Sequence, residues 1–75
     1  MTSTAYAVLE SIKRGNLTVP EISADLGIPP GRVDRTLRVI LTREKCVARA
    51  GVQHIPRGRP AVLWALTDAG KEAAS

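Results

Sequence analysis

The sequence predicts an α+β fold in which three helices precede a β-hairpin and a short final helix. Two observations support this prediction. Apolar residues recur at helical spacing as far as residue 44, and from residue 47 onward they alternate as strand residues do. The chain has 75 residues, which suits one domain with one small core, so we expect a single domain over residues 1–75.

The first helix is expected at residues 4–14, followed by Gly15 as a stop. Its apolar stripe consists of Ala5, Val8, Leu9 and Ile12. A capping box opens the second helix, because the Thr18 hydroxyl can accept a first-turn N–H while Glu21 reaches back to the cap. This helix buries Ile22 and Leu26, and Gly27 ends it at little conformational cost.

The third helix is expected at residues 30–44, directly after a short turn. Its inward stripe consists of Val33, Leu37, Ile40 and Leu41. Its outward face is expected to carry Arg32, Asp34, Arg35, Thr36, Arg38 and Thr42. A helix, a short turn and a second helix with a basic outer face together predict a helix-turn-helix unit.

The period then changes from helix to strand. Residues 47–52 and 61–66 predict two strands, and Val62, Trp64 and Leu66 share one face of the second. The Pro- and Gly-rich residues 53–60 form the loop between them. Thr67 and Asp68 predict a cap for a short helix over residues 69–74, which Gly70 weakens.

Positive charge is concentrated in the middle of the sequence. The chain has a net charge of +4, but residues 30–60 alone carry +6 and the remainder −2. Such a basic segment favours a polyanion-binding face, and the alternative is a solvated surface that keeps the chain soluble.

Three stretches resemble the winged helix-turn-helix DNA-binding domain of bacterial regulators of the MarR, ArsR and PadR type. They are Glu21-Ile-Ser-Ala-Asp-Leu-Gly-Ile28, Arg32-Val-Asp-Arg-Thr-Leu-Arg38 and Gly58-Arg-Pro-Ala-Val-Leu-Trp-Ala-Leu-Thr-Asp-Ala-Gly70. They are similar to the positioning helix, the recognition helix and the return strand of the wing. The segment 43–47 departs from this pattern, because it lacks the usual glycine and holds one extra residue.

The resemblance implies double-stranded DNA as the partner, with helix 30–44 in the major groove. Arg32 and Arg35 are then candidates for bidentate contacts to guanine or for contacts to phosphate. Asp34 has two interpretations, a contact to cytosine or an ion pair with Arg38 four residues on. Thr36 is a candidate for contact with a phosphate or a thymine methyl group.

The loop 53–60 corresponds to the wing tip. Arg57 and Arg59 are expected to reach the phosphates or the minor groove beside the recognition helix. Trp64 is expected in the core in preference to stacking on a base, and Cys46 is expected to be a small buried hydrophobe.

Taken together, the sequence predicts a small transcriptional regulator that binds double-stranded DNA with sequence preference. An architectural factor of a mobile element and a protein-interaction module are the alternatives. Cys46 and His54 are the only residues of their kinds, so we expect no enzyme, no catalytic group, no metal and no cofactor. We also expect a homodimer or a protein partner, no evident small-molecule effector, no membrane span and a cytoplasmic location.

Overall fold

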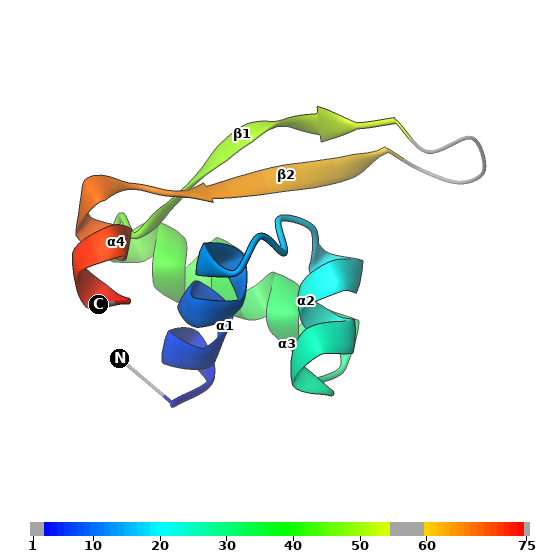
Figure 1. Cartoon of the computed structure of the whole chain (residues 1–75), viewed down its shortest axis with the longest axis horizontal. Helices are drawn as coiled ribbons and strands as arrows, with labels where there is room; N and C mark the ends of the chain where they lie inside the picture. Colours follow the sequence, from blue (N-terminus) through cyan, green and yellow to red (C-terminus); the bar gives the residue numbers. More distant parts are fainter. Residues whose placement is uncertain (1–2, 55–59, 75) are drawn as a thin grey trace.

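A computed structural model describes residues 3–54 and 60–74 of the chain. The elements in order are α1 (Ser3–Lys13), α2 (Val19–Leu26), α3 (Pro30–Arg35), η1 (Thr36–Leu41), β1 (Val47–Gln53), β2 (Ala61–Leu66) and α4 (Asp68–Ala73). The helices form one layer, and the hairpin extends along one side of it, with α4 beside the N-terminal helix (Figure 1). The α+β fold class and the predicted order of elements are confirmed.

The core lies between the three N-terminal helical segments and the inner face of the hairpin. Its members are aliphatic except for Cys46 and Trp64, each of which has an exposed fraction of 3%. The core consists of Ala5, Val8, Leu9, Ile12, Ile22, Val33, Leu37, Leu41, Cys46, Val47 and Trp64. Val62 and Leu66 pack against it from the strand of Trp64, so the predicted inward face of β2 is confirmed. Cys46 is buried, as expected.

Local capping fixes the ends of α2. The Thr18 hydroxyl accepts a hydrogen bond from the Glu21 N–H, and the Glu21 carboxylate accepts one from the Thr18 N–H at 3.2 Å, which completes the capping box. Gly27 ends the helix in the left-handed conformation, with φ of 66°. The Ser23 hydroxyl then donates to the Ile28 carbonyl and holds the turn that leads into α3.

The third helix is not the regular α-helix expected over residues 30–44. After α3, η1 continues as a π-helix, in which the Thr42 N–H donates to the Leu37 carbonyl five residues back. The Thr42 hydroxyl donates to the same carbonyl at 2.7 Å. A π turn holds one residue more than an α turn, and the 3.6-residue period read from the apolar stripe does not reveal it.

The helix ends in a Schellman motif in which Lys45 takes the place usual for glycine. The Cys46 N–H donates to the Leu41 carbonyl at 2.9 Å, and the Lys45 N–H donates to the Thr42 carbonyl at 3.1 Å. Lys45 has a φ of 59°, a left-handed conformation that costs a residue with a side chain roughly 1–2 kcal/mol. The helix end that the sequence left without a glycine is therefore made by a strained lysine.

The two strands of the hairpin are antiparallel, with a bulge at Ala50. Val47 pairs with Leu66 and Arg49 pairs with Trp64, after which the register shifts so that Gly51 faces Leu63. The Trp64 N–H donates to the Leu17 carbonyl at 2.8 Å, which joins the hairpin to the segment between α1 and α2. This bond fixes the base of the hairpin against the helical layer.

The final helix, α4, docks onto the turn between η1 and β1. Its cap, Thr67, accepts a hydrogen bond from the Gly70 N–H and donates its hydroxyl to the Lys45 carbonyl. Gly70 is buried, and a Cβ there would lie 2.0 Å from the Cys46 carbonyl oxygen. Gly70 thus permits a close approach of two backbones, a role that helix propensity does not show. Within the described ranges, no helix has both the length and the apolar character needed to cross a membrane.

Candidate nucleic-acid interface

The turn after α2 presents the first two turns of α3 to solvent. Val33 faces inward and is completely buried, while Arg32 and Arg35 are exposed. Among the described residues, neither arginine has a carboxylate within ion-pair distance. Both guanidinium groups can therefore donate their full set of hydrogen bonds to a ligand.

Asp34 and Arg38 form an ion pair on the same face of the helix. The Arg38 Nε donates to Asp34 Oδ1 at 2.9 Å, and both side chains are partly exposed. Of the two interpretations open for Asp34, the ion pair with its i+4 neighbour is thus the one present in the structure. Such an exposed pair contributes only a few tenths of a kcal/mol, so its effect lies mainly in orienting Arg38.

Thr36 does not lie on the outward face, and that expectation is wrong. Its exposed fraction is 4%, and its hydroxyl donates to the Arg32 carbonyl at 2.8 Å. Thr36 follows Val33 by three residues and precedes Ile40 by four, which is the spacing of the buried stripe. Its hydroxyl is compatible with burial because the helix itself supplies an acceptor.

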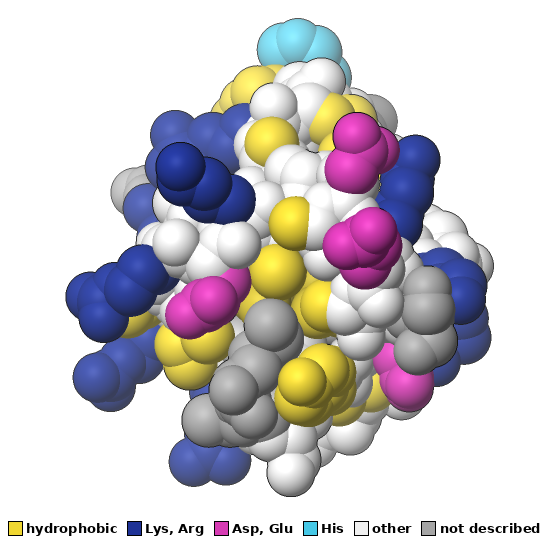
Figure 2. Space-filling model, turned by 90° about the vertical axis from the view of Figure 1, so that its left-hand side faces the viewer, with side chains coloured by type: hydrophobic (Ala, Val, Ile, Leu, Met, Phe, Trp, Pro, Cys, Tyr) yellow, Lys and Arg dark blue, Asp and Glu magenta, His cyan; other side chains and the backbone are white. Residues whose placement is uncertain are grey.

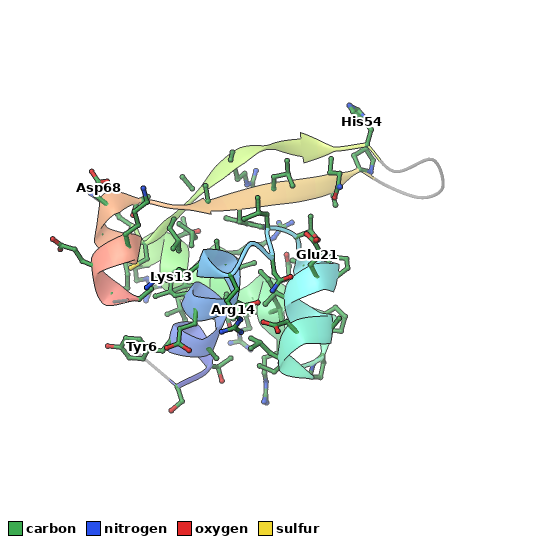
Figure 3. The ribbon with its side chains drawn as sticks, viewed as in Figure 1. Tyr6, Lys13, Arg14, Glu21, His54 and Asp68 are labelled. Carbon is green, nitrogen blue, oxygen red and sulfur yellow. The ribbon has the colours of Figure 1, made fainter. Side chains whose placement is uncertain are left out.

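The predicted wing arginines, Arg57 and Arg59, lie outside the described residues. The described part of the hairpin ends at His54, which is exposed and lies at the far end of β1 (Figure 3). The described part of the hairpin extends from α4 toward the end of the molecule where α2 lies (Figure 1).

A groove separates the third helix from the hairpin. One part, of about 530 Å³, is lined by Arg38, Thr42, Val47, Ala48, Arg49 and Trp64. A smaller part, of about 270 Å³, also contains Arg38 and Trp64 and continues toward Asp34 and Pro60. Arg49 was not among the residues predicted to bind DNA. Strand alternation could have found it, because Arg49 follows the inward-facing Val47 by two residues.

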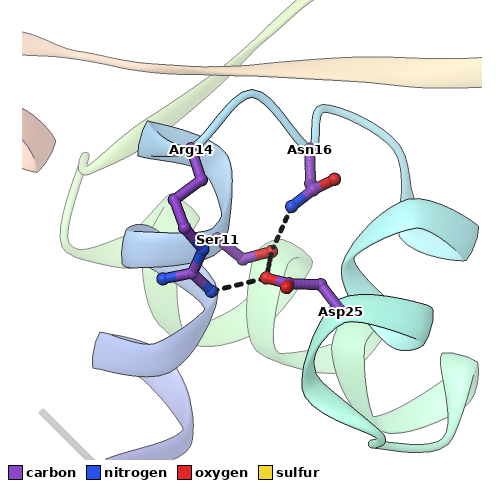
Figure 4. A network of polar contacts seen from close by, with 4 residues as sticks. All are labelled: Ser11, Arg14, Asn16 and Asp25. Carbon is purple, nitrogen blue, oxygen red and sulfur yellow. Dashed lines mark hydrogen bonds and ion pairs between the residues drawn. The ribbon is translucent and has the colours of Figure 1, made fainter.

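A polar network outside this face fixes α2 against α1. Asp25 Oδ2 accepts hydrogen bonds from the Ser11 hydroxyl at 2.8 Å and from an Arg14 Nη, and the Asn16 amide donates to Ser11 (Figure 4). The Arg14 guanidinium and then the Ser11 hydroxyl lower the pKa of the Asp25 carboxyl. The network holds the first helix of the helix-turn-helix unit in place.

The end of the molecule that carries α4 has a different character. Hydrophobic and acidic side chains occupy the middle of this end, and Lys and Arg side chains lie along its edges (Figure 2). Tyr6 points toward this end from α1 and is 46% exposed (Figure 3). The described residues contain no cluster of His, Cys, Asp and Glu that could hold a metal ion.

Solved structures similar to this chain are members of the MarR family. The zinc-responsive MarR family member ZitR of Lactococcus lactis superposes with a TM-score of 0.81 and 26% identity, over 99% of this chain and 49% of ZitR. The MarR family transcription regulator SP03579 superposes with a TM-score of 0.78 and 21% identity, over 99% of this chain and 47% of SP03579. Wild-type ZitR in complex with DNA superposes with a TM-score of 0.76 and 24% identity, over 99% of this chain and 48% of ZitR.

These likenesses confirm the winged-helix fold of the MarR type. This chain spans about half the length of the solved structures it matches. No protein-family model and no curated protein sequence matches it.

Proposed function

We propose that this protein is a transcriptional regulator that binds double-stranded DNA with sequence preference. The observation that carries this proposal is the likeness to MarR-family regulators, one of them solved in complex with DNA, together with two exposed arginines on the helix after the turn that form no ion pair within residues 3–54 and 60–74. A winged-helix module with a basic recognition helix suits a polyanionic duplex.

In the proposed complex, the helix over residues 30–44 enters the major groove. Arg32 and Arg35 lie in its first turns and reach base edges or phosphates, since guanidinium groups match guanine and phosphate acceptors alike. Arg38 follows on the same face, with Asp34 holding it. Thr36 is left out of this set because it is buried.

The wing supplies the second contact. The loop over residues 53–60 lies on the adjacent backbone or in the minor groove, where Arg57 and Arg59 meet the most negative potential. Their contribution is largely independent of sequence and sensitive to salt, because phosphate contacts release condensed counterions.

A homodimer completes the proposal, since one module of this size reads only a short half-site. The end that bears Tyr6 is the surface we assign to the second copy, because an exposed tyrosine lies there among hydrophobic, acidic and basic groups. Tyr6→Ser is expected to shift the protein toward monomer in sedimentation velocity. An unchanged sedimentation profile at every protein concentration would contradict this surface.

The decisive experiment is selection of bound duplexes from a random DNA pool at near-physiological salt. An enriched motif is the expected result, and an inverted repeat within it supports the two-fold dimer. Weak retention without enrichment would favour an architectural role, and no retention would favour a protein-interaction module.

Variants then test the assignment of residues. Arg35→Ala is expected to cost about 1–3 kcal/mol on the selected duplex and to relax one base position. Replacing Arg57 and Arg59 by alanine should weaken binding evenly across sequences and reduce its salt dependence. Lys13→Ala removes one charge from α1 and is the matched control. If Arg35→Ala resembles this control, the helix face is assigned wrongly.

A further inference from the structure

We propose that Arg49 binds a backbone phosphate of the DNA, together with Arg38, in the groove between η1 and β1. This inference rests on the proposed function and adds a third point of contact, between the recognition helix and the wing. Arg49 lies at the base of the hairpin, outside the sequence motifs that predicted DNA contacts.

The hairpin register places Arg49 over the groove. Arg49 lies directly opposite Trp64, and residues opposite each other in antiparallel strands share one face, so Arg49 extends on the side of the helices. The bulge at Ala50 follows immediately and bends the strand at this point. The base of the wing thus aims an arginine at the gap between hairpin and helix.

The Trp64 ring holds the Arg49 side chain in place. The guanidinium carbon of Arg49 lies 5.8 Å from the centre of that ring, within the range of a cation–π contact. Trp64 itself is anchored in the core and by its N–H bond to the Leu17 carbonyl. A guanidinium group stacked on a rigid ring keeps the N–H donors along the edge of the guanidinium plane free. Because the arginine side chain is already held in place, it loses little conformational freedom when an anion binds.

The part of the groove that Arg49 lines is positively charged. Its lining contains two arginines and no carboxylate. Among the described residues, Arg49 has no ion pair that an anion would have to displace. A concave surface of one sign with low-dielectric walls strengthens the local potential and favours an anion there.

Arg38 provides the opposite wall with a second guanidinium group. Its Nε is bonded to Asp34, which lies in the neighbouring part of the groove, so the two terminal nitrogens remain as donors. A phosphate offers acceptor oxygens that match two guanidinium forks. Arg38 lies within η1, and the exposed Thr42 that follows this π-helix belongs to the same lining.

The test compares three variants of the full chain on the selected duplex. Arg49→Gln is expected to bind about tenfold more weakly and to lower the slope of log affinity against log salt by about 0.9. Arg49→Lys keeps the charge and is expected to retain most of the slope while losing affinity. Lys13→Gln removes one charge outside the lining of this groove, and its affinity should change by less than about twofold. Circular dichroism verifies that each variant is folded.

The phosphate is identified with duplexes in which single backbone positions carry a neutral methylphosphonate. Neutralising the phosphate that Arg49 contacts should weaken the wild type about tenfold and Arg49→Gln much less, which is the signature of direct coupling. Additive losses at every position would overturn the inference, as would an Arg49→Gln variant that equals Lys13→Gln. In both cases sequence-selective binding still stands. If the wild type binds no duplex, the proposed function fails as well.

Discussion

Gly70 gives the sharpest test of how α4 is attached. Judged by helix propensity alone, Gly70→Ala should stabilise the protein by about 1 kcal/mol. The structure predicts the opposite sign, because the new Cβ would lie 2.0 Å from the Cys46 carbonyl oxygen and 2.9 Å from its carbonyl carbon. Both obstacles are backbone atoms, so no side-chain rotation relieves the overlap.

The magnitude follows from what must move. Shifting α4 away from Cys46 strains two hydrogen bonds of Thr67, its hydroxyl to the Lys45 carbonyl and its N–H to the Cys46 carbonyl. Each such bond contributes about 0.5–1.5 kcal/mol, and overpacking costs about 1–3 kcal/mol. With the propensity gain of about 1 kcal/mol subtracted, we expect a net loss of about 1–5 kcal/mol, which corresponds to a fall in Tm of at least about 4 °C.

Thermal unfolding followed by circular dichroism measures this loss, and the chain contains a matched control. Gly31 lies in α3, has no positive φ, and a Cβ there would meet nothing within 4 Å. Gly31→Ala should therefore leave Tm unchanged or raise it. If Gly70→Ala raises Tm as well, the packing of α4 on the turn before β1 is wrong.

Three further predictions test other parts of the fold. Lys45→Gly should raise the free energy of unfolding by about 0.5–1 kcal/mol in urea titration, because glycine adopts a φ of 59° without strain; a loss would contradict the left-handed conformation. Leu37→Ala should cost about 2–5 kcal/mol and leave little folded protein, since Leu37 is fully buried, whereas the exposed Val39→Ala should cost far less. The lowered pKa of Asp25 means that its stabilising effect is present above the carboxyl's unfolded value of 3.8 and is lost as pH falls below it. Asp25→Asn should therefore flatten the fall in Tm on the acid side of about pH 4, and an unchanged acid-side slope would exclude the Arg14 contact.

The features that sequence spacing predicted correctly are those set by near neighbours. The capping box of Thr18 and Glu21 spans three residues, the pair of Asp34 and Arg38 spans four, and Gly27 acts at a single position. Each depends on a backbone geometry that residues three or four apart largely determine. The helix-turn-helix unit was predictable because it is built from such local signals.

The features that were missed depend on contacts between distant segments. Gly70 was interpreted as a weak helix residue, yet its role depends on a carbonyl in the turn before β1. The π-helix and the left-handed Lys45 end the third helix shortly before β1 begins. The position of that strand is not encoded in the apolar period of the helix, so the period did not predict either feature. Thr36 was predicted on the outward face because it is polar, whereas its spacing from Val33 predicts the buried position that it occupies.

In the candidate site, too, the residues of the helix depend on local spacing, whereas the groove depends on contacts between distant segments. The exposure of Arg32, Arg35 and Arg38 was predicted because the outward face of one helix can be traced from its own period. The pairing of Arg49 with Trp64 depends on the register between two strands, and the bulge at Ala50 shifts that register, so loop length alone does not predict the pairing. Yet Arg49 and Trp64 are both in phase with an inward-facing neighbour on their own strand, Val47 and Val62. An arginine two residues after a core valine lies on the core side of its strand, so alternation within β1 was enough to place the exposed Arg49 on the side of the helices.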